Sequence, residues 1–245
     1  MTLLRSTIFI VWFSLVSAVL GLLFLPAFAL PRAVTAWMAR RWAALTFWGL
    51  RVFAGTRFEV RGPRPPNGVL LAIKHMSMWE TMAIYYLLDD PAIVLKRELQ
   101  LVPFYGWYLK KARMIPIDRG GKSSALRKMA AAASREIAAG RSVAIFPEGT
   151  RKKPGAPPDY KPGVAALYSQ LGVPCVPVAL NSGLFWTGPV GFIKKAGTIV
   201  IAFLDPIPPG LPRREFMPRL ETAIETASNA LIAEGKNQLE RRNSR

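Results

Sequence analysis

The single histidine of the chain is the residue best suited to acid–base chemistry. His75 directly follows the short apolar run 69–73, which has the composition of a buried strand. Open α/β sheets bind their ligands at the carboxyl ends of strands, so this position places the imidazole at a candidate site. Glu80 follows five residues later. A lone histidine after a strand is also often a purely structural hydrogen-bonding group, so the spacing alone leaves that role open.

The local sequence indicates how His75 and Glu80 could meet. Five residues along a continuous helix turn two side chains about 140° apart, so the two cannot share one helical face. Ser77 and Glu80, however, have the spacing of a capping box, in which the acid returns toward the start of the helix. A carboxylate on one ring nitrogen fixes the tautomer and makes the other nitrogen a better base. We expect a dyad that deprotonates a substrate hydroxyl directly, with Ser77 as the alternative, a nucleophile forming an acyl-enzyme.

Cationic residues follow several of the expected strands. The motif 146–151 (FPEGTR) comes after the run 142–146 and ends in Arg151, whose guanidinium suits bidentate recognition of phosphate. Arg119 follows the run 114–117, and Lys96 follows the run 92–95. Each cation alone fits a solvated surface charge. Together, on the edge that carries the histidine, they predict an anion-binding site.

The overall composition restricts the kind of partner. The net charge is +18 and 51% of the residues are hydrophobic. Such an excess of positive charge attracts nucleic acid or anionic lipid. The apolar N-terminus favours lipid, and the sequence has no zinc spacing, aromatic RNA-binding signature or basic zipper that would indicate nucleic acid. With one histidine and one cysteine, no metal or other cofactor is expected.

The one cysteine, Cys175, excludes an intramolecular disulfide and fits a reducing compartment. It lies in the apolar run 173–180, so we expect a small buried hydrophobic residue.

The N-terminal segment is long enough to cross a membrane. No charged residue occurs between Arg5 and Arg32, and a spanning helix needs roughly 20 apolar residues. Residues 33–54 mix tryptophan with arginine, as an interfacial helix does. A cleaved signal peptide, one spanning helix and a hairpin in one leaflet are the three interpretations. Most nearby positive charge follows the apolar run, which predicts that the C-terminal side stays in the cytoplasm.

The remainder of the chain has an α/β pattern. Strands are expected at 69–73, 92–95, 114–117, 142–146, 176–180 and 198–204, and helices at 124–139, 163–171 and 215–234. This alternation predicts an α/β fold with a mixed, largely parallel sheet flanked by helices. We therefore expect membrane-anchoring helices in residues 1–56, an enzymatic domain in residues 57–245, and a frayed tail at 241–245.

Four blocks in this order resemble the glycerolipid acyltransferase family. They are His75 with its acid, the strand that leads to Arg119, the motif 146–151, and the run VPCVPV at 173–178. The similarity extends over about residues 68–181 and is greatest to the members that acylate lysophosphatidic acid. It implies that an acyl chain passes from acyl-CoA or acyl-carrier protein to the sn-2 hydroxyl, giving phosphatidic acid at the cytoplasmic face of a bacterial inner membrane. It also implies contact with anionic membrane lipid.

The resemblance also implies roles for individual residues. His75 would be the base and Glu80 its partner. The substrate phosphate would be bound by Lys96, Arg119, Glu148, Gly149, Thr150 and Arg151, and the acyl donor would lie near Val173, Pro174, Val176 and Pro177.

Two departures from the family pattern concern the acid, which is usually aspartate, and the second block, where Arg113 and Pro116 replace the usual residues. Acyl transfer to another lyso-lipid, such as a lyso-ornithine lipid or glycerol 3-phosphate, and a non-catalytic lipid-binding protein are the alternatives.

Overall fold

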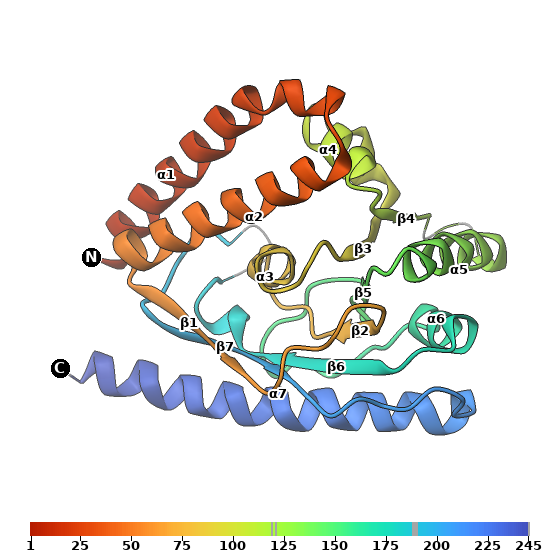
Figure 1. Ribbon diagram of the computed structural model, residues 1–245. Helices are drawn as coiled ribbons and strands as arrows, with labels where there is room; N and C mark the ends of the chain where they lie inside the picture. The colour runs from red at the N-terminus through yellow and green to blue at the C-terminus, as the bar shows by residue number, and fades with distance from the viewer. Residues whose placement is uncertain (119, 121, 188–190, 245) are drawn as a thin grey trace.

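A computed structural model describes all residues of the protein except 119, 121, 188–190 and 245 (Figure 1). The strands are β1 (Thr56–Arg61), β2 (Leu70–Ile73), β3 (Ala92–Lys96), β4 (Ile115–Ile117), β5 (Val143–Ile145), β6 (Cys175–Leu180) and β7 (Gly197–Phe203). The helices are α1 (Thr2–Leu23), α2 (Arg32–Gly49), α3 (Trp79–Leu87), α4 (Tyr105–Lys111), α5 (Lys122–Ala138), α6 (Gly163–Leu171) and α7 (Arg213–Asn243).

The seven strands form one sheet in the order β1-β7-β6-β2-β5-β3-β4. Every neighbouring pair is parallel except β6 and β7. The prediction of a mixed, largely parallel sheet is therefore confirmed. A parallel sheet exposes the carboxyl ends of its strands at one edge, which is the edge expected to carry the site.

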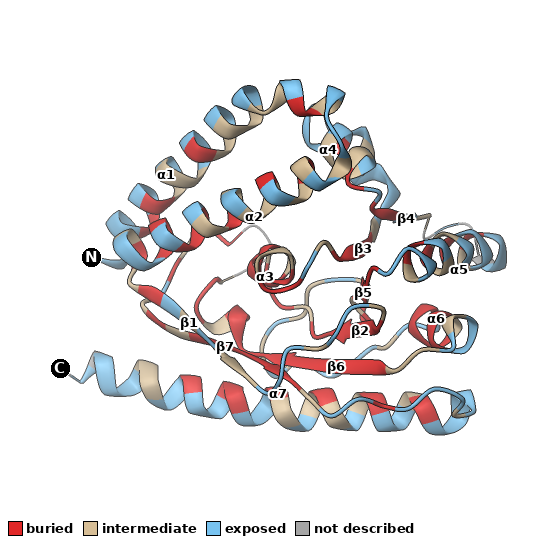
Figure 2. Cartoon of the chain, in the orientation of Figure 1, coloured by how far each residue is buried: buried red, intermediate tan, exposed pale blue. Residues whose placement is uncertain are grey.

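Alternating side chains of the strands supply both faces of the core. In β2, Leu71 and Ile73 join a cluster with residues of α1, α2 and α3, whereas Leu70 and Ala72 join a second cluster with α5, α6 and α7. Helices thus cover both faces of the sheet (Figure 2). A strand buried on both faces has no polar positions, which explains why β2 reads as a continuous apolar run.

The structure confirms all six predicted strands and adds one. The strand β1 was missed because Arg57, Glu59 and Arg61 interrupt its apolar residues. It lies at the outer edge of the sheet, where one side of a strand faces solvent and charge is tolerated.

The expectation of a frayed tail at 241–245 is corrected, because helix α7 continues to Asn243.

Helices α1 and α2 pack side by side and form a cap over the α3 face (Figure 1). Trp12 donates its indole N–H to the Leu45 carbonyl at 3.1 Å, and Trp42 donates to Ser17 Oγ at 3.0 Å. Of the helices in the described residues, only α1 is long and apolar enough to cross a membrane. It leaves most of its side chains exposed, which is consistent with membrane association.

Candidate active site

Strand pairing brings the two main sequence motifs together. Strands β2 and β5 are parallel neighbours, with Leu70 opposite Val143 and Ala72 opposite Ile145. The residues that follow each strand, His75 and the 146–151 motif, therefore emerge at the same edge. The His75 ring stacks on Phe146 with a centroid distance of 4.0 Å. Lys152 N–H also donates to the His75 carbonyl at 2.8 Å, so the two loops hold each other.

The expected contact between His75 and Glu80 is present. His75 Nδ1 lies 2.9 Å from Glu80 Oε1, and the imidazole is largely buried with 13% of its surface exposed. The acid returns as the capping box predicts, because Ser77 N–H donates to Glu80 Oε1 at 2.6 Å. Ser77 Oγ, in turn, accepts the N–H of Trp79, the first residue of α3, at 3.1 Å. The turn that begins helix α3 thus also positions the imidazole.

The Glu80 carboxylate is fully buried and surrounded by donors. Oε1 accepts the N–H groups of Met76 and Ser77 as well as His75 Nδ1, and Oε2 accepts the hydroxyls of Ser77 and Ser182. Burial raises the pKa of this carboxyl, but His75 and the other donors outweigh it and hold the pKa below its usual value. An ionised carboxylate only accepts hydrogen bonds, so His75 Nδ1 carries a proton and Nε2 is left as the basic nitrogen.

Ser77 does not have the geometry of a nucleophile. Its side chain is fully buried, and its hydroxyl donates to Glu80 Oε2 at 2.8 Å while accepting from Trp79. A nucleophilic serine instead presents its oxygen to the substrate and its proton to the base. The structure gives Ser77 a positioning role.

Glu148 lies inward rather than toward solvent. It is 1% exposed, and its Oε1 accepts from Lys74 Nζ at 2.9 Å. Its Oε2 lies 3.4 Å from the His75 backbone N–H, which donates to it. Lys74 also pairs with Glu225 of α7 at 2.7 Å. Burial raises the pKa of Glu148, although the Lys74 ammonium opposes that rise.

The other predicted phosphate ligands lie at different depths along this edge. Arg151 is half-buried, Gly149 adopts a left-handed turn with φ 64°, and Thr150 is exposed. Lys96 ends β3, two strands from β2, and its exposed ammonium lies 3.4 Å from Glu98. Arg119 lies outside the described residues. Gly149, Thr150 and Arg151 therefore share the loop that packs against His75, whereas Lys96 lies two strands away.

The predicted acyl-donor residues are not brought to His75. Val173 and Pro174 precede β6, and the start of β6 is level with the start of β2 because Cys175 pairs with Leu70. His75 follows the far end of β2, so about five residues of strand, roughly 16 Å, separate the two levels. Val176 and Pro177 are buried within the sheet. Their position gives no support to contact with a thioester at His75.

Three contributors to the site were not predicted. Ser182 follows β6 and reaches Glu80 Oε2 at 2.7 Å, while Lys74 and Glu225 form the buried ion pair. A signal existed only for Lys74, a charged residue that continues an otherwise apolar strand. Ser182 and Glu225 are over 100 residues from Glu80, and only the tertiary fold brings them close.

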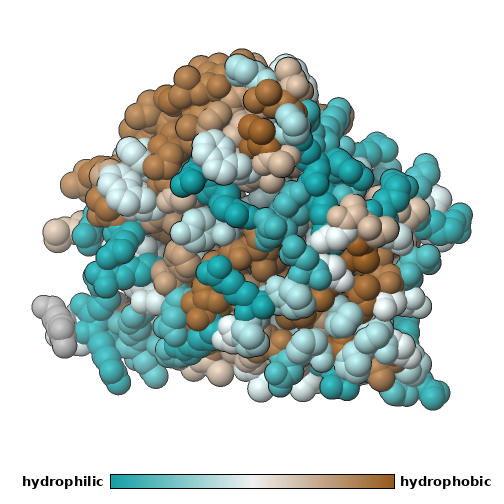
Figure 3. Space-filling model, viewed as in Figure 1, coloured by the Kyte–Doolittle hydropathy of each residue, from teal (hydrophilic) through white to brown (hydrophobic). Residues whose placement is uncertain are grey.

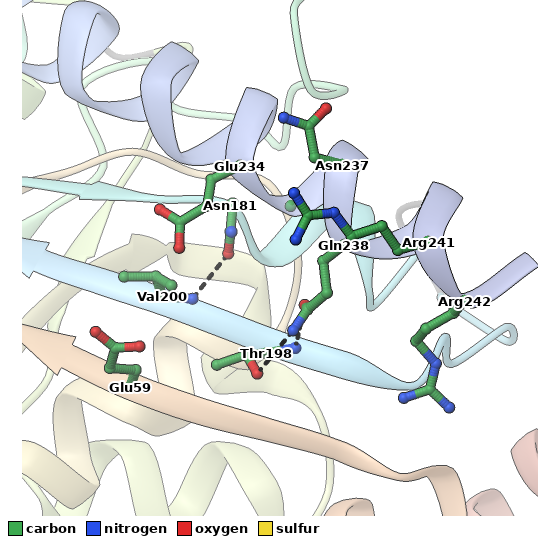
Figure 4. A pocket seen from close by; sticks show the side chains of 10 residues that line it. Glu59, Asn181, Thr198, Val200, Glu234, Asn237, Gln238, Arg241 and Arg242 are labelled. Atoms are coloured by element: carbon green, nitrogen blue, oxygen red, sulfur yellow. Dashed lines mark hydrogen bonds between the residues drawn. The ribbon is translucent and has the colours of Figure 1, made fainter.

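A polar groove of about 580 Å³ lies elsewhere, between β7, β1 and the C-terminal half of α7 (Figure 4). Its walls include Asn181, Thr198 and Gln238, and Gln238 accepts a hydrogen bond from the Thr198 N–H. None of the motif residues lines this groove. Cys175 is fully buried, as expected, and burial raises the pKa of its thiol.

The fold and the site define an α/β protein in which a histidine–glutamate pair lies beside a loop that carries an arginine. Comparison with known proteins is consistent with this class. Residues 57–181 match the acyltransferase family. The chain is 34% identical over 235 residues to a 1-acyl-sn-glycerol-3-phosphate acyltransferase of Pseudomonas aeruginosa, covering 94% of this chain and 90% of that protein. The protein therefore belongs to the acyltransferase family.

Two further relatives extend the comparison. A lyso-ornithine lipid O-acyltransferase of Pseudomonas aeruginosa is 28% identical over 203 residues, covering 75% of this chain and 78% of that protein. The crystal structure of the 1-acyl-sn-glycerophosphate acyltransferase of Thermotoga maritima superposes with a TM-score of 0.75 at 20% identity, covering 94% of this chain and 98% of that one. The second match shows that the two proteins share a fold.

Proposed function

We propose that the protein transfers an acyl chain from acyl-CoA or acyl-carrier protein to the sn-2 hydroxyl of lysophosphatidic acid, giving phosphatidic acid. The observation that carries the proposal is the His75–Glu80 contact of 2.9 Å beside the 146–151 motif. The 34% identity over nearly the whole chain to a protein with this activity supports the same acceptor.

The geometry supports direct attack by the acceptor hydroxyl. His75 Nε2 takes the hydroxyl proton as the alcohol oxygen bonds to the thioester carbonyl carbon. The resulting imidazolium is stabilised by the buried Glu80 carboxylate. The tetrahedral intermediate collapses, the carbon–sulfur bond breaks, and the leaving thiolate takes the proton from the imidazolium. His75 and Glu80 return to their starting states.

The acceptor phosphate would lie against the cationic part of the same edge. Arg151 supplies a guanidinium, and the left-handed turn at Gly149 directly precedes Thr150 and Arg151. Thr150 adds an exposed hydroxyl. Lys96, at the end of β3, and Arg119, which lies outside the described residues, complete the proposed set.

The proposed location is the cytoplasmic face of a bacterial inner membrane. Residues 1–56 would anchor the protein through α1 and α2, and residues 57–245 would carry the reaction. A net charge of +18 favours a surface of anionic lipid, with each well-placed cation contributing about 1 kcal/mol. Lysophosphatidic acid reaches the site from the membrane, and acyl-CoA or acyl-carrier protein reaches it from the cytoplasm.

A second acceptor is favoured by one observation, the 28% identity to a lyso-ornithine lipid O-acyltransferase. That acceptor carries no phosphate, so Arg151 would contact its ornithine carboxylate instead. A panel of lyso-lipid acceptors with acyl-CoA and acyl-carrier protein, analysed by mass spectrometry, separates the two. Acylation of lyso-ornithine lipid in preference to lysophosphatidic acid would overturn the proposed acceptor while leaving the family chemistry intact.

Replacement of the base tests the mechanism. His75→Ala should reduce acyl transfer by about a hundredfold to ten-thousandfold, the range that general-base catalysis contributes. The variant should still fold and bind vesicles, because Glu80 keeps its four other hydrogen-bond donors. Substantial transfer by a folded His75→Ala protein would exclude His75 as the base.

A further inference from the structure

Exposed apolar side chains are concentrated in two stretches of the described chain. Apart from Phe192, every exposed large hydrophobic residue in the described parts of the chain lies within residues 1–52 or 99–107. The first stretch is the α1–α2 cap, whose outer surface is largely hydrophobic in Figure 3. The second belongs to the catalytic part of the chain. Its members are Leu99, Leu101, Val102, Phe104, Tyr105 and Trp107.

The backbone of the second stretch is built to present these side chains. Leu101 is 71% exposed at the end of a short 3₁₀ turn, and Phe104 has a positive φ of 60°. Gly106 packs so closely that an added Cβ would lie 2.3 Å from the Gln100 carbonyl. Such backbone strain is retained where the surrounding structure imposes it, often at functional sites. The stretch is therefore a fixed apolar projection.

This projection is continuous with the α1–α2 cap. Phe28 stacks on Tyr108 with a centroid distance of 4.7 Å and contacts Trp107 edge-on. Lys111 Nζ donates to the Phe28 carbonyl at 3.1 Å. The apolar projection and the cap thus form one surface.

The charge around the projection selects the partner. Residues 96–113 contain five cations (Lys96, Arg97, Lys110, Lys111 and Arg113) and one acid, Glu98. Apolar and aromatic side chains flanked by cations suit the headgroup layer of an anionic membrane.

We propose that residues 99–107 form a second lipid-contacting surface, which seats the edge of the site on the leaflet that holds the acceptor. The stretch begins three residues after β3, whose last residue, Lys96, belongs to the proposed phosphate-binding set. Only one part of this proposal, delivery of the acceptor lipid to the site, rests on the proposed function. Contact with lipid is independent of it.

A fluorescent label tests contact without any assay of activity. The native Cys175 is buried, so Leu101→Cys can be labelled selectively with an environment-sensitive probe. Ser169→Cys, on the exposed side of α6, is the matched control. On adding phosphatidylcholine–phosphatidylglycerol vesicles, the probe at position 101 should shift to the blue and be quenched by nitroxide-labelled lipids. The probe at position 169 should not change.

Two results would overturn lipid contact. One is a probe at position 101 that behaves as the probe at position 169 does. The other is a blue shift that rises with protein concentration in the absence of vesicles, because a second copy of the chain would then cover the surface.

The role in substrate delivery has its own test. The double variant Leu101→Ser/Val102→Ser should raise the apparent KM for vesicle-embedded lysophosphatidic acid by about tenfold or more, as expected for loss of two buried apolar side chains. Its activity toward a monomeric short-chain lysophosphatidic acid should equal that of the wild type, and Phe192→Ser should change neither value. Equal losses with both substrates, or in both variants, would exclude a delivery role. A wild type inactive toward both substrates would refute the proposed function instead.

A separate observation concerns the buried ion pair next to the dyad. Lys74 is 2% exposed, and its ammonium lies 2.9 Å from Glu148 and 2.7 Å from Glu225. Tyr160 donates its hydroxyl to Glu225 at 2.9 Å. These contacts join three segments: the turn of His75, the 146–151 motif and helix α7.

We also infer that Glu148 is a positioning residue and not a ligand of the substrate phosphate. One of its oxygens is held by Lys74 and the other faces the His75 N–H. A buried carboxylate with both oxygens engaged has little to offer an anionic phosphate, which it would repel. Glu225 and Tyr160, acting through Lys74, instead support the backbone at His75.

The tyrosine hydroxyl offers a mild variant that should fold. Tyr160→Phe removes only the hydrogen bond to Glu225, and Glu225→Gln removes one charge from the cluster. Both should lower kcat, by roughly threefold and tenfold, with the KM for lysophosphatidic acid unchanged. Tyr168→Phe is the matched control, since its hydroxyl donates to the Pro208 carbonyl on the far side of α6. It should lower the melting temperature without changing kcat.

A rise in KM with kcat preserved in the first two variants would return Glu148 to the phosphate site. Equal kcat values in Tyr160→Phe and Tyr168→Phe would show that the ion-pair cluster around Lys74 has only a structural role. Neither result depends on which lyso-lipid is the natural acceptor, because the comparison is made between variants with one acceptor.

Discussion

At the scale of single residues, the carboxylate of Glu80 determines the protonation of the site. Five donors converge on its two oxygens, so the ionised form is favoured although the group is fully buried. Its pKa in the folded state lies below the ordinary 4.5. Glu80 therefore stabilises the fold above that pH, and the stabilisation is lost as the pH falls through the lowered pKa. The raised pKa of Glu148 acts in the opposite sense.

Replacement of Ser182 is the least disruptive test of the hydrogen bonds around Glu80. Removing its hydroxyl in Ser182→Ala takes one of two donors from Glu80 Oε2 and loosens the imidazole that Glu80 orients. We expect kcat to fall about tenfold with KM unchanged, as for the loss of a hydrogen bond to a charged group. Steady-state kinetics measure both. Ser228→Ala is the control, because Ser228 is equally buried and its hydroxyl has no hydrogen-bond partner in the described part of the chain.

Arg151 is the predicted phosphate ligand with the best chemistry for the task. Arg151→Ala should raise the KM for lysophosphatidic acid by about tenfold or more, because a charge-assisted contact to the phosphate is lost. The value of kcat should change less. The exposed neighbour Lys153 serves as control in Lys153→Ala. An unchanged KM in Arg151→Ala would remove that residue from the phosphate site.

The residues of the dyad were predictable because they are local in sequence. Ser77 and Glu80 form a turn whose geometry follows from four consecutive residues, and that turn carries His75. Ser182 and Glu225 were not predictable, since a serine after a strand and a glutamate on a helix look like ordinary surface residues. Their role exists only once β6 and α7 are packed against the site.

At the scale of elements, the same distinction separates the strands. The six predicted strands consist almost entirely of apolar residues, so their composition alone reveals them, whereas the edge strand β1 carries three charges. The sequence revealed the length of helix α1 but not how the helix packs against the rest of the protein. That docking depends on Lys194, in the loop between β6 and β7, whose ammonium lies 4.2 Å from the centroid of the Trp186 ring and 5.3 Å from that of Phe9.

Lys194 gives the stability of the fold a dependence on pH. Burial lowers the pKa of Lys194 to about 8, and the loop carbonyls of Gly191 and Phe192 accept from its ammonium. An unfolded chain has the ordinary pKa of 10.5, so it binds the proton more tightly than the folded protein does. Stability should therefore rise as the pH increases from about 8 to about 10.5.

A pair of lysine variants isolates this contribution. The melting temperature of the wild type should rise between pH 8 and pH 10 relative to that of Lys194→Met, which cannot titrate. Lys195→Met, at the exposed neighbouring position, should keep the behaviour of the wild type. Parallel melting curves for the wild type and Lys194→Met across this range would contradict the expectation.

At the scale of the whole molecule, contacts limit how α1 can lie in a membrane. With 22 residues it is about 33 Å long, enough to cross the hydrocarbon core. Near its N-terminus, Ser6 Oγ accepts the Lys194 N–H at 2.9 Å, and near its C-terminus the Gly21 carbonyl accepts from Tyr108 at 2.9 Å. Both partners belong to the α/β part of the chain. A helix fastened to one body at both ends does not place those ends on opposite sides of a bilayer.

We therefore expect α1 and α2 to lie within one leaflet as a hairpin. Thr2→Cys and Leu30→Cys, one at each end of the hairpin's first arm, can be labelled without interference because the native Cys175 is buried. A membrane-impermeant maleimide should label both from the face that carries the catalytic part, and neither from the other face. Labelling of the two positions from opposite faces would show a spanning helix. The contacts of Ser6 and Gly21 would then have to break on insertion, and with them the support that α1 gives to the Trp186 loop beside the site.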